Sequence, residues 1–451
     1  MKLWEKGIRT EPSIIEFTSG SDRETDLLLT RWDIVGSMAH AVMLETVGLL
    51  THNDAHDLLT ALQSLMLTDK EKGIKIEPGV EDIHSQIEKE LIALIGDKGK
   101  KIHTGRSRND QVQVDIRLYL RHETDRLAYL IKNLFLKLNA LSGKYKEVFL
   151  PGYTHMQPAM LSSFGQWFGA YSEALADDIH LLAGARKTIN RNPLGTAAGY
   201  GTTLPLDRKL TTELLGFENM IFNSAYAGLS RGKAELAAAS ALASVAQTLS
   251  RLSMDICLFM TAEYHFIDFP DELVTGSSIM PQKRNPDVFE LIRARMNLVQ
   301  ALPVQICMIT GNLPSGYNRD LQLLKHLVFD GYSEVGQSVE ILLLMLESIK
   351  IRENILENPA YNNIYSTEEV NRLVRQGVPF RDAYRQVAEK IKESSFSGTS
   401  LSEYTHHGSI GNLCNEEISL YFESAMNEFR IRTPDEYAEE ILKRGGVIQK
   451  L

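Results

Sequence analysis

The sequence predicts a mainly α-helical protein with a bundle of five long helices at its centre. Between residues 127 and 141, apolar side chains recur at alternating spacings of four and three, as in a helix buried along one stripe, and this stripe continues from residues 112, 116 and 120. Further stretches show long helical patterns with few breakers, and strands do not alternate with helices, which argues against dinucleotide-binding and barrel folds. The five helices are expected at about 109–141, 162–190, 234–264, 286–308 and 320–351.

Shorter helices are expected on both sides of this bundle. We expect an N-terminal helical domain at 1–105, the long-helix domain at 106–351 and a C-terminal helical domain at 352–451. Apolar residues spread over more than one stripe of the long helices predict self-association, because one chain cannot easily cover them all. The shorter helices are expected at Ile34–Leu50, Asp54–Leu67, Glu81–Ile95, Phe380–Lys392 and Asp435–Lys443, and a kink of the fourth long helix is expected at Pro303.

The composition is that of a soluble globular chain and argues against several function classes. The 451 residues carry 48 Lys and Arg against 58 Asp and Glu, and this net charge of −10 disfavours a nucleic-acid partner. Three cysteines without a Cys-x-x-Cys pair predict neither a disulfide framework nor a cysteine zinc site. Met1–Lys6 lacks the apolar core of a signal peptide, and the longest apolar run, Ile341–Leu346, is too short to span a membrane. We therefore expect a cytoplasmic protein.

Two polar stretches precede the first and second long helices. His103–Asp110 places two arginines, hydroxyls and an amide at a helix N-terminus, which suits a carboxylate or a phosphate. Gly152–Pro158 contains His155 close to Thr154 and a glutamine, a setting for an acid or base held in one tautomer. Taken singly, the first stretch is equally a solvated capping segment, and the histidine is more often one satisfied by hydrogen bonds in a loop.

A third polar stretch, Thr275–Asp287, is interrupted by glycine and proline and precedes the fourth long helix. It carries two serines, a lysine and an asparagine, and Glu290 follows one turn into the helix. Reactive groups on a loop that helices hold in place indicate a functional site, and an ordinary turn that only connects two helices is the alternative. No spacing predicts a metal site, because the histidines are scattered at His84, His103, His122 and His155.

Two of these stretches closely resemble motifs of known enzymes. Gly276–Pro286, reading GSSIMPQKRNP, resembles the loop shared by the fumarase/aspartase superfamily, and His103–Gln111, reading HTGRSRNDQ, resembles the argininosuccinate lyase family in particular. The resemblance runs from about residue 16 to residue 330. It also covers Asp33–Ser37, Glu81–His84, Gly152–Gln157 and Tyr317–Gln322.

The resemblance implies a three-domain, almost all-helical subunit. It also implies a homotetramer whose central domains form one core of twenty helices, with each active site assembled from three subunits. The implied reaction is the reversible β-elimination of argininosuccinate to arginine and fumarate, the last step of arginine biosynthesis, without cofactor or metal. No nucleic acid or membrane takes part.

The resemblance further implies roles for individual residues. Ser277 would remove the proton and His155, polarised by Glu290, would protonate the leaving nitrogen; the opposite assignment of Ser277 and His155 is left open. Lys283 and Asn285 would stabilise the negative charge that develops on the substrate. Substrate contacts are implied for Asp82, Ser107, Arg108, Asn109, Thr154, Asn285, Tyr317, Gln322 and Lys325, with Arg108 holding a carboxylate.

The chain departs from the family pattern in several places. Asp22 stands where the family has a substrate-contacting serine, and Ser19 or Ser21 could replace it. Ser230-Arg231-Gly232 stands for Asp-Arg-Asp, and Leu323-Leu324 for an acidic pair. After the histidine the chain reads Gln157-Pro158-Ala159-Met160 instead of the usual Gln-Arg-Ala-Gln. The alternatives are another fumarate-releasing lyase, such as adenylosuccinate lyase or fumarase, and a catalytically silent, crystallin-like homologue.

Overall fold

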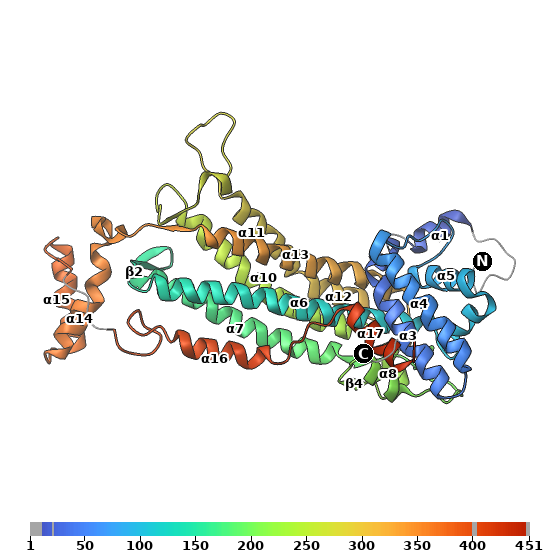
Figure 1. The fold of residues 1–451 in the computed structure, drawn as a ribbon. Helices are drawn as coiled ribbons and strands as arrows, with labels where there is room; N and C mark the ends of the chain where they lie inside the picture. Colours follow the sequence, from blue (N-terminus) through green and yellow to red (C-terminus); the bar gives the residue numbers. More distant parts are fainter. Residues whose placement is uncertain (1–10, 20–21, 399–403, 448–451) are drawn as a thin grey trace.

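The computed structural model describes residues 11–19, 22–398 and 404–447 and forms an elongated, mainly helical molecule (Figure 1). The N-terminal helices gather at one end, long helices run along the middle, and a small helical pair occupies the other end. The predictions for Met1–Lys6 and Ser21 lie outside the described residues. Within the described ranges, no helix is long and apolar enough to cross a membrane.

Long helices form the central bundle and share one hydrophobic core. Phe135, Phe168, Leu242 and Tyr332 are fully buried in that core, because each bundle helix turns an apolar stripe toward its neighbours. The predicted mainly α fold with a bundle of long helices is thereby confirmed. The bundle helices are α6 (Arg108–Lys144), α7 (Phe164–Ile189), α10 (Lys233–Phe259), α11 (Asp287–Val299), α12 (Leu302–Thr310) and α13 (Leu324–Glu347).

Three bundle helices differ from their predicted limits. The expected single helix at 286–308 is two helices, because α11 ends at Val299 and α12 begins at Leu302. Pro303 therefore does not kink a continuous helix; it lies in the first turn of α12, where its missing N–H has no helical partner to lose. In addition, α10 ends at Phe259, and α13 is preceded by the 3-10 helix η4 (Arg319–Leu323).

The N-terminal helices surround α3, which is buried along almost its whole length. A second hydrophobic core, with residues such as Ile34, Leu58 and Leu91, holds these helices together. Side chains at the starts of two helices accept backbone N–H groups, Thr51 for α4 and Asp82 for α5. The elements are α1 (Pro12–Ser19), α2 (Asp22–Asp26), η1 (Leu27–Leu29), α3 (Thr30–Thr46), α4 (His52–Lys72), α5 (Ile83–Ile95) and η2 (Gly96–His103).

The segment after residue 351 contributes to three parts of the molecule. Helices α14 and α15 pack on each other in a small cluster of their own. Helix α16 lies along the bundle, where Phe422 stacks on Phe135 with ring centroids 4.0 Å apart. Helix α17 packs on α3. The predicted division of the chain into domains at residues 105 and 351 stays a prediction. The elements are η5 (Ile355–Glu357), η6 (Pro359–Tyr365), α14 (Ser366–Arg375), α15 (Phe380–Lys392), α16 (Asn415–Met426) and α17 (Pro434–Arg444).

Short strands, none of them predicted, join the helices. Strands β1 (Phe149–Thr154) and β2 (Gln157–Ser163) form an antiparallel hairpin between α6 and α7. His155 and Met156 make its two-residue turn with φ of 53° and 63°, which is the backbone of a type I′ turn. The remaining short elements are β3 (Arg191–Asn192), α8 (Arg208–Leu214), β4 (Asn219–Met220), α9 (Ser224–Leu229), β5 (Ile267–Asp268), η3 (Asp271–Leu273) and β6 (Lys350–Ile351).

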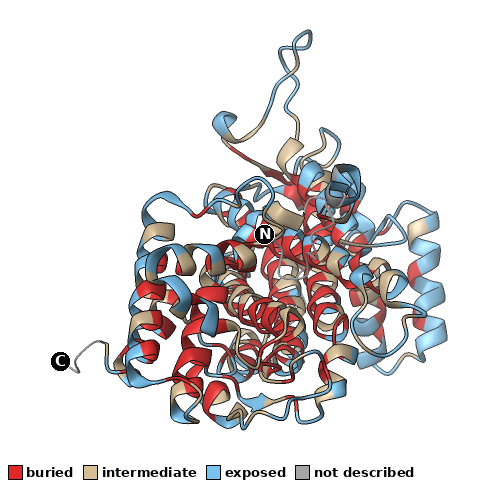
Figure 2. Ribbon diagram, turned by 90° about the vertical axis from the view of Figure 1, so that its right-hand side faces the viewer, coloured by how far each residue is buried: buried red, intermediate tan, exposed pale blue. Residues whose placement is uncertain are grey.

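Apolar side chains also lie on the outside of the bundle. Figure 2 shows the buried residues inside the bundle and exposed residues around it. On α11 and α12, Leu298 is 73% exposed and Met308 is 77% exposed, and Leu291 and Val304 are exposed as well. These large apolar side chains on neighbouring helices are the feature from which self-association was predicted.

Candidate active site

A cleft lies where α5 and the N-terminus of α6 face α2 and the segment 317–325; it is called the α6 cleft below. Its volume of about 800 Å³ suits a small organic substrate. Residues expected to bind substrate line it from sequence positions more than two hundred residues apart. These residues are Asp82, Arg108, Asn109, Tyr317, Gln322 and Lys325.

The N-terminus of α6 is fixed by a capping box. The Ser107 hydroxyl accepts a hydrogen bond from the Asn109 N–H at 3.3 Å, and Asp110 accepts one from the Ser107 N–H at 2.9 Å. The second Asp110 oxygen accepts the N–H groups of Gly195 and Ala197, each at 2.9 Å. Asp110 thus joins α6 to the 195–197 turn, and Ser107, a predicted substrate contact, serves in the cap.

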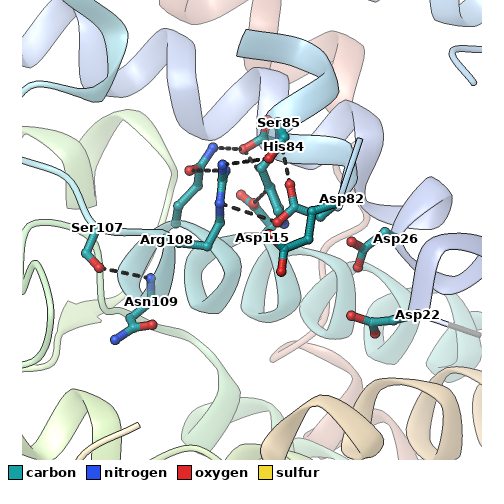
Figure 3. Close-up of polar contacts among 12 residues, drawn as sticks. Asp22, Asp26, Asp82, His84, Ser85, Ser107, Arg108, Asn109 and Asp115 are labelled. Carbon is teal, nitrogen blue, oxygen red and sulfur yellow. Dashed lines mark hydrogen bonds and ion pairs between the residues drawn. The ribbon is translucent and has the colours of Figure 1, made fainter. Parts of the chain in front are cut away.

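Arg108 is held in one orientation by three side chains (Figure 3). Its Nη1 donates to Gln111 at 2.8 Å, its Nη2 donates to Ser85 at 3.1 Å, and its Nε lies 3.4 Å from Asp82. Burial acts to raise the pKa of Asp82, but the charges of Arg108 and His84 lower it overall, so this carboxylate is ionised. The guanidinium therefore ties α5 to α6 and lines the cleft with its orientation already set.

Behind the side of the cleft that Arg108 lines, three side chains lie close together in the interior of the protein. They are Asp33 of α3, His84 of α5 and Asp115 of α6. His84 Nδ1 lies 3.1 Å from Asp33 and 3.4 Å from Asp115, without an aligned hydrogen bond to either among the described residues. Burial acts to raise the pKa of Asp33, yet His84 and Arg106 lower it overall; burial and Asp33 raise the pKa of Asp115. The three groups connect three helices behind the cleft.

Among the described residues, this group brings three possible metal-ligand atoms close together. One ligand atom from each of Asp33, His84 and Asp115 lies within 4.8 Å of the others. The buried Arg106, whose Nη1 donates to Ser37 at 2.9 Å, already brings a positive charge to these carboxylates. The arrangement therefore suits a buried charge network at least as well as a bound cation.

The opposite wall of the α6 cleft is formed by Lys325 and two carboxylates. The Lys325 ammonium lies 2.6 Å from Asp22 and also pairs with Asp26. Gln322 Nε2 donates to the carbonyl of Thr18 at 3.0 Å. Asp22 and Ser19 both line the cleft, and Ser21, the third candidate for the N-terminal contact, lies outside the described residues.

Arg231 is a cleft residue to which the sequence assigned no role. It is buried, its Nε lies 3.6 Å from Glu235, and its guanidinium carbon lies 5.9 Å from the Tyr317 ring centroid. Its Nε has no hydrogen-bond partner among the described residues, so its donor capacity is incompletely used. Gly232 has a φ of +87°, and a Cβ there would lie 2.4 Å from Thr310, so this backbone leaves no room for the family's aspartate.

The other predicted residues lie outside the α6 cleft. Thr154 and His155 are exposed at the tip of the β1–β2 hairpin, at the far end of α6. The loop that precedes α11 stands away from the body of the molecule (Figures 1 and 2). Lys283, Asn285 and Glu290 line a second cavity, of about 580 Å³, at its base. No hydrogen bond or ion pair joins His155 to Glu290 within the described part of the chain.

The base of this loop is braced and its tip is open to solvent. The Asn285 N–H donates to Thr275 at 2.8 Å, and Arg284 lies 3.1 Å from Asp268. Near the tip, the Ser277 hydroxyl oxygen accepts the N–H groups of Ile279 and Met280, each at 3.3 Å. The tip residue Ile279 is 82% exposed, and Ser277 close to it is half-buried.

Comparison with known proteins identifies the family of this chain. The model of the Lyase family matches residues 9–301. An argininosuccinate lyase of Phocaeicola vulgatus is 48% identical over 443 residues, which are 98% of this chain and 99% of the relative. An argininosuccinate lyase of Parabacteroides distasonis is 47% identical over 441 residues, or 98% and 99% of the two chains. The chain belongs to the argininosuccinate lyase family. It is a lyase of carbon–nitrogen bonds.

The fold agrees with this family and with its wider superfamily. A solved structure of EDDS lyase in complex with formate matches with a TM-score of 0.72 and 21% identity, covering 97% of this chain and 94% of that one. Identity at that level shows the shared fold alone. Within the argininosuccinate lyase family, the departures at Asp22 and at Ser230-Arg231-Gly232 both lie at the α6 cleft or beside it.

Proposed function

We propose that the protein reversibly splits argininosuccinate into L-arginine and fumarate, as the last step of arginine biosynthesis in the cytoplasm. The family assignment and the size and polarity of the α6 cleft support this reaction. The observation that carries the proposal is the division of the predicted site residues among the α6 cleft, the hairpin tip and the loop before α11. Each place supplies a different part of an elimination.

The separation of these places is explained by a homotetramer whose sites each draw on three subunits. Exposed leucines on α11 and exposed apolar residues on α12 provide faces on which a second copy of the bundle can pack. The exposed hairpin tip of one subunit and the outstanding loop of another would then complete the α6 cleft of a third. The proposed twenty-helix core follows from the same packing.

The difficult step is removal of a proton from the carbon next to a succinate carboxylate. The resulting intermediate carries two negative charges on that carboxyl group, so cations and N–H donors aimed at its oxygens supply much of the rate acceleration. Lys283 and Asn285 take this role in the proposal. Ser277 is the proposed base, and the two backbone N–H groups that its oxygen already accepts favour its deprotonated form.

The electron pair left on carbon then forms the double bond of fumarate as the carbon–nitrogen bond breaks. His155, oriented by Glu290 from another subunit, donates a proton to the departing guanidine nitrogen. The opposite assignment, with His155 as base and Ser277 as acid, balances equally well. Substrate binding is proposed for Asp82, Ser107, Arg108, Asn109, Thr154, Asn285, Tyr317, Gln322 and Lys325.

Release of fumarate from argininosuccinate tests the reaction. We expect the ultraviolet absorbance of fumarate to rise with argininosuccinate and to stay flat with adenylosuccinate and malate. Release from adenylosuccinate or malate instead would assign the chain to a different lyase. The absence of any release at saturating argininosuccinate would indicate a silent homologue.

Hybrid oligomers test whether the sites are shared. His155→Asn and Ser277→Ala subunits are each expected to be inactive alone, and their co-assembled mixture should regain part of the activity. In that mixture, some sites receive both intact residues from different subunits. The matched control combines His155→Asn with Thr154→Ala on the same hairpin, which should restore little. Equal recovery in both mixtures would contradict the proposed sharing.

A further inference from the structure

Arg284 joins the loop before α11 to the 268–271 segment, which precedes the loop in the chain. Its guanidinium contacts the Asp271 carboxylate, lies 3.1 Å from the Asp268 carboxylate and donates to the carbonyl oxygen of Phe269. A single ion pair between partly exposed groups holds two segments together only weakly. Three acceptors around one planar guanidinium fix its direction as well as its position, so this network is a stronger attachment than one pair.

The 268–271 segment is itself fixed to the body of the protein. Phe269 is fully buried, and its ring packs on Phe289 of α11 with the ring centroids 5.1 Å apart. Asp268 belongs to β5, which pairs with β6. The acceptors of Arg284 are therefore held by the body of the protein, whereas the loop that carries Arg284 stands away from it (Figures 1 and 2).

Arg284 lies between two residues that the proposed mechanism uses. Lys283 and Asn285 are its neighbours in the chain, and consecutive Cα atoms are about 3.8 Å apart, so a fixed Arg284 limits where both can lie. The Asn285 N–H also donates to Thr275 at 2.8 Å, which closes the base of the loop. Lys283 has no ion pair among the described residues, so its ammonium is left for the substrate while Arg284 makes the attachment.

We propose that Arg284 is a positioning residue for the elimination: it holds the base of the loop so that Lys283 and Ser277 meet the substrate in the productive arrangement. This inference rests on the proposed function and adds to it a residue that does not touch the substrate. A loop without this attachment reaches the productive arrangement less often, and misplacement by about 1 Å slows a reaction by about a hundredfold. Substrate contacts in the α6 cleft are unchanged, so the loss falls on kcat more than on KM.

Steady-state kinetics on three variants test the proposal. Arg284→Met removes the guanidinium, a double variant with Asp268→Asn and Asp271→Asn neutralises its two carboxylates, and a triple variant combines all three changes. We expect Arg284→Met to lower kcat for argininosuccinate by about tenfold to a hundredfold, with KM changed by less than about threefold. The double variant should lower kcat by about threefold to tenfold, because the Phe269 carbonyl still accepts from Arg284.

The triple variant shows whether the contact itself is responsible. Once Arg284 is removed, the two aspartates have no guanidinium to hold, so the triple variant should have the same kcat as Arg284→Met. Multiplied losses in the triple variant overturn the proposal, because the carboxylates would then act by a different route. A wild-type kcat in Arg284→Met, or a KM that rises as much as kcat falls, overturns it too. The matched control is Arg372→Met on α14, an exposed arginine paired with Glu369, which should keep wild-type kinetics.

Failure of this inference and failure of the proposed function give different results. If wild type releases no fumarate from argininosuccinate, the reaction itself is wrong. If wild type releases fumarate and Arg284→Met keeps its kcat, only the role of Arg284 is wrong. Light scattering and melting temperatures show whether each variant assembles and folds. If Arg284→Met does not fold, the double variant with Asp268→Asn and Asp271→Asn decides: a lower kcat at unchanged KM supports the proposal, and wild-type kinetics overturn it.

Discussion

The charged residues of the α6 cleft and of the loop before α11 differ in whether other side chains pair with them. In the cleft, Arg108 is held by three side chains of the same chain, and Lys325 by two carboxylates. On the loop, the Lys283 ammonium has no ion pair among the described residues, and Ile279 near the tip is 82% exposed. In the proposed mechanism, the cleft receives the substrate and the loop contacts it from another subunit.

This difference bears on where the chemistry takes place. A lysine and a serine in open water stabilise a doubly charged intermediate weakly, because solvent screens their charges. The same groups become effective when they are enclosed with the substrate in a site that excludes water. In the proposed mechanism the cleft provides the enclosure and the loop provides the groups, so the contrast supports the proposal that other subunits complete each site.

The largest effect is expected from a charge placed on the outer face of the bundle. Leu298→Arg on α11 would put a guanidinium where a second bundle is proposed to pack, and burying it unpaired is too costly for assembly. We expect the mass in light scattering to fall below that of a tetramer and fumarate release to be lost. Leu67→Arg on α4, an exposed leucine outside the bundle, should keep both. A monomeric Leu298→Arg enzyme with full activity would show that one chain suffices.

Behind the α6 cleft, substitution of a buried carboxylate should change the stability of the protein. Asp33→Asn removes the carboxylate whose pKa is lowered by His84 and Arg106, leaving buried charge uncompensated, and should lower the free energy of unfolding by about 3 kcal/mol or more. Asp115, whose pKa is raised by burial and by Asp33, tolerates a neutral side chain better, so Asp115→Asn should cost about 1 kcal/mol. Denaturant unfolding at one fixed protein concentration measures both. Equal costs would mean that the two carboxylates are not differentiated.

Substitutions in the loop before α11 and in the hairpin should change the turnover rate and not the stability. Ser277→Ala and His155→Asn change exposed or half-exposed side chains, so the folded state should be unaffected. We expect each to lower kcat by about a hundredfold or more, with a smaller change in KM. Steady-state kinetics beside a melting curve make the comparison. A Ser277→Ala enzyme that turns over at the wild-type rate contradicts its assignment as base.

The sequence predicted what depends on local pattern and on motif. Alternating spacings of four and three located the first long helix, long stretches with few breakers located the others, and the polar stretches before α6 and α11 were recognised as motifs. The β1–β2 hairpin was missed because its turn, His155-Met156, contains none of the glycine or asparagine that usually marks a type I′ turn. A kink was predicted at Pro303, whereas the helix breaks between Val299 and Leu302 and the proline lies in the first turn of α12, where it is well tolerated.

Contacts between residues far apart in the chain could not be predicted from the sequence. Nothing near Asp22 in the chain indicates that it meets Lys325, since the pairing depends on α2 packing against α13. Arg231 belongs to a short stretch whose departure from the family pattern suggested lost carboxylates, whereas the fold places Glu235 beside it. Such contacts appear only when distant helices are brought together, and they decide which charged groups remain for a ligand.

The smallest expected effect is a pH dependence that separates Asp22 from the rest of the cleft. Asp22 lines the α6 cleft, and its pKa of about 6 means that it is protonated below that pH, so the affinity for arginine, whose α-amino group is an ammonium, should rise by about tenfold as the pH increases through 6 and then level off. Asp26 on the same helix, Lys325 from α13 and His84 from α5 also face Asp22, and they remain in Asp22→Asn. The part of the profile that disappears in Asp22→Asn therefore belongs to Asp22. A variant profile that matches wild type would assign the titration to a neighbour and leave Asp22 without a part in binding arginine.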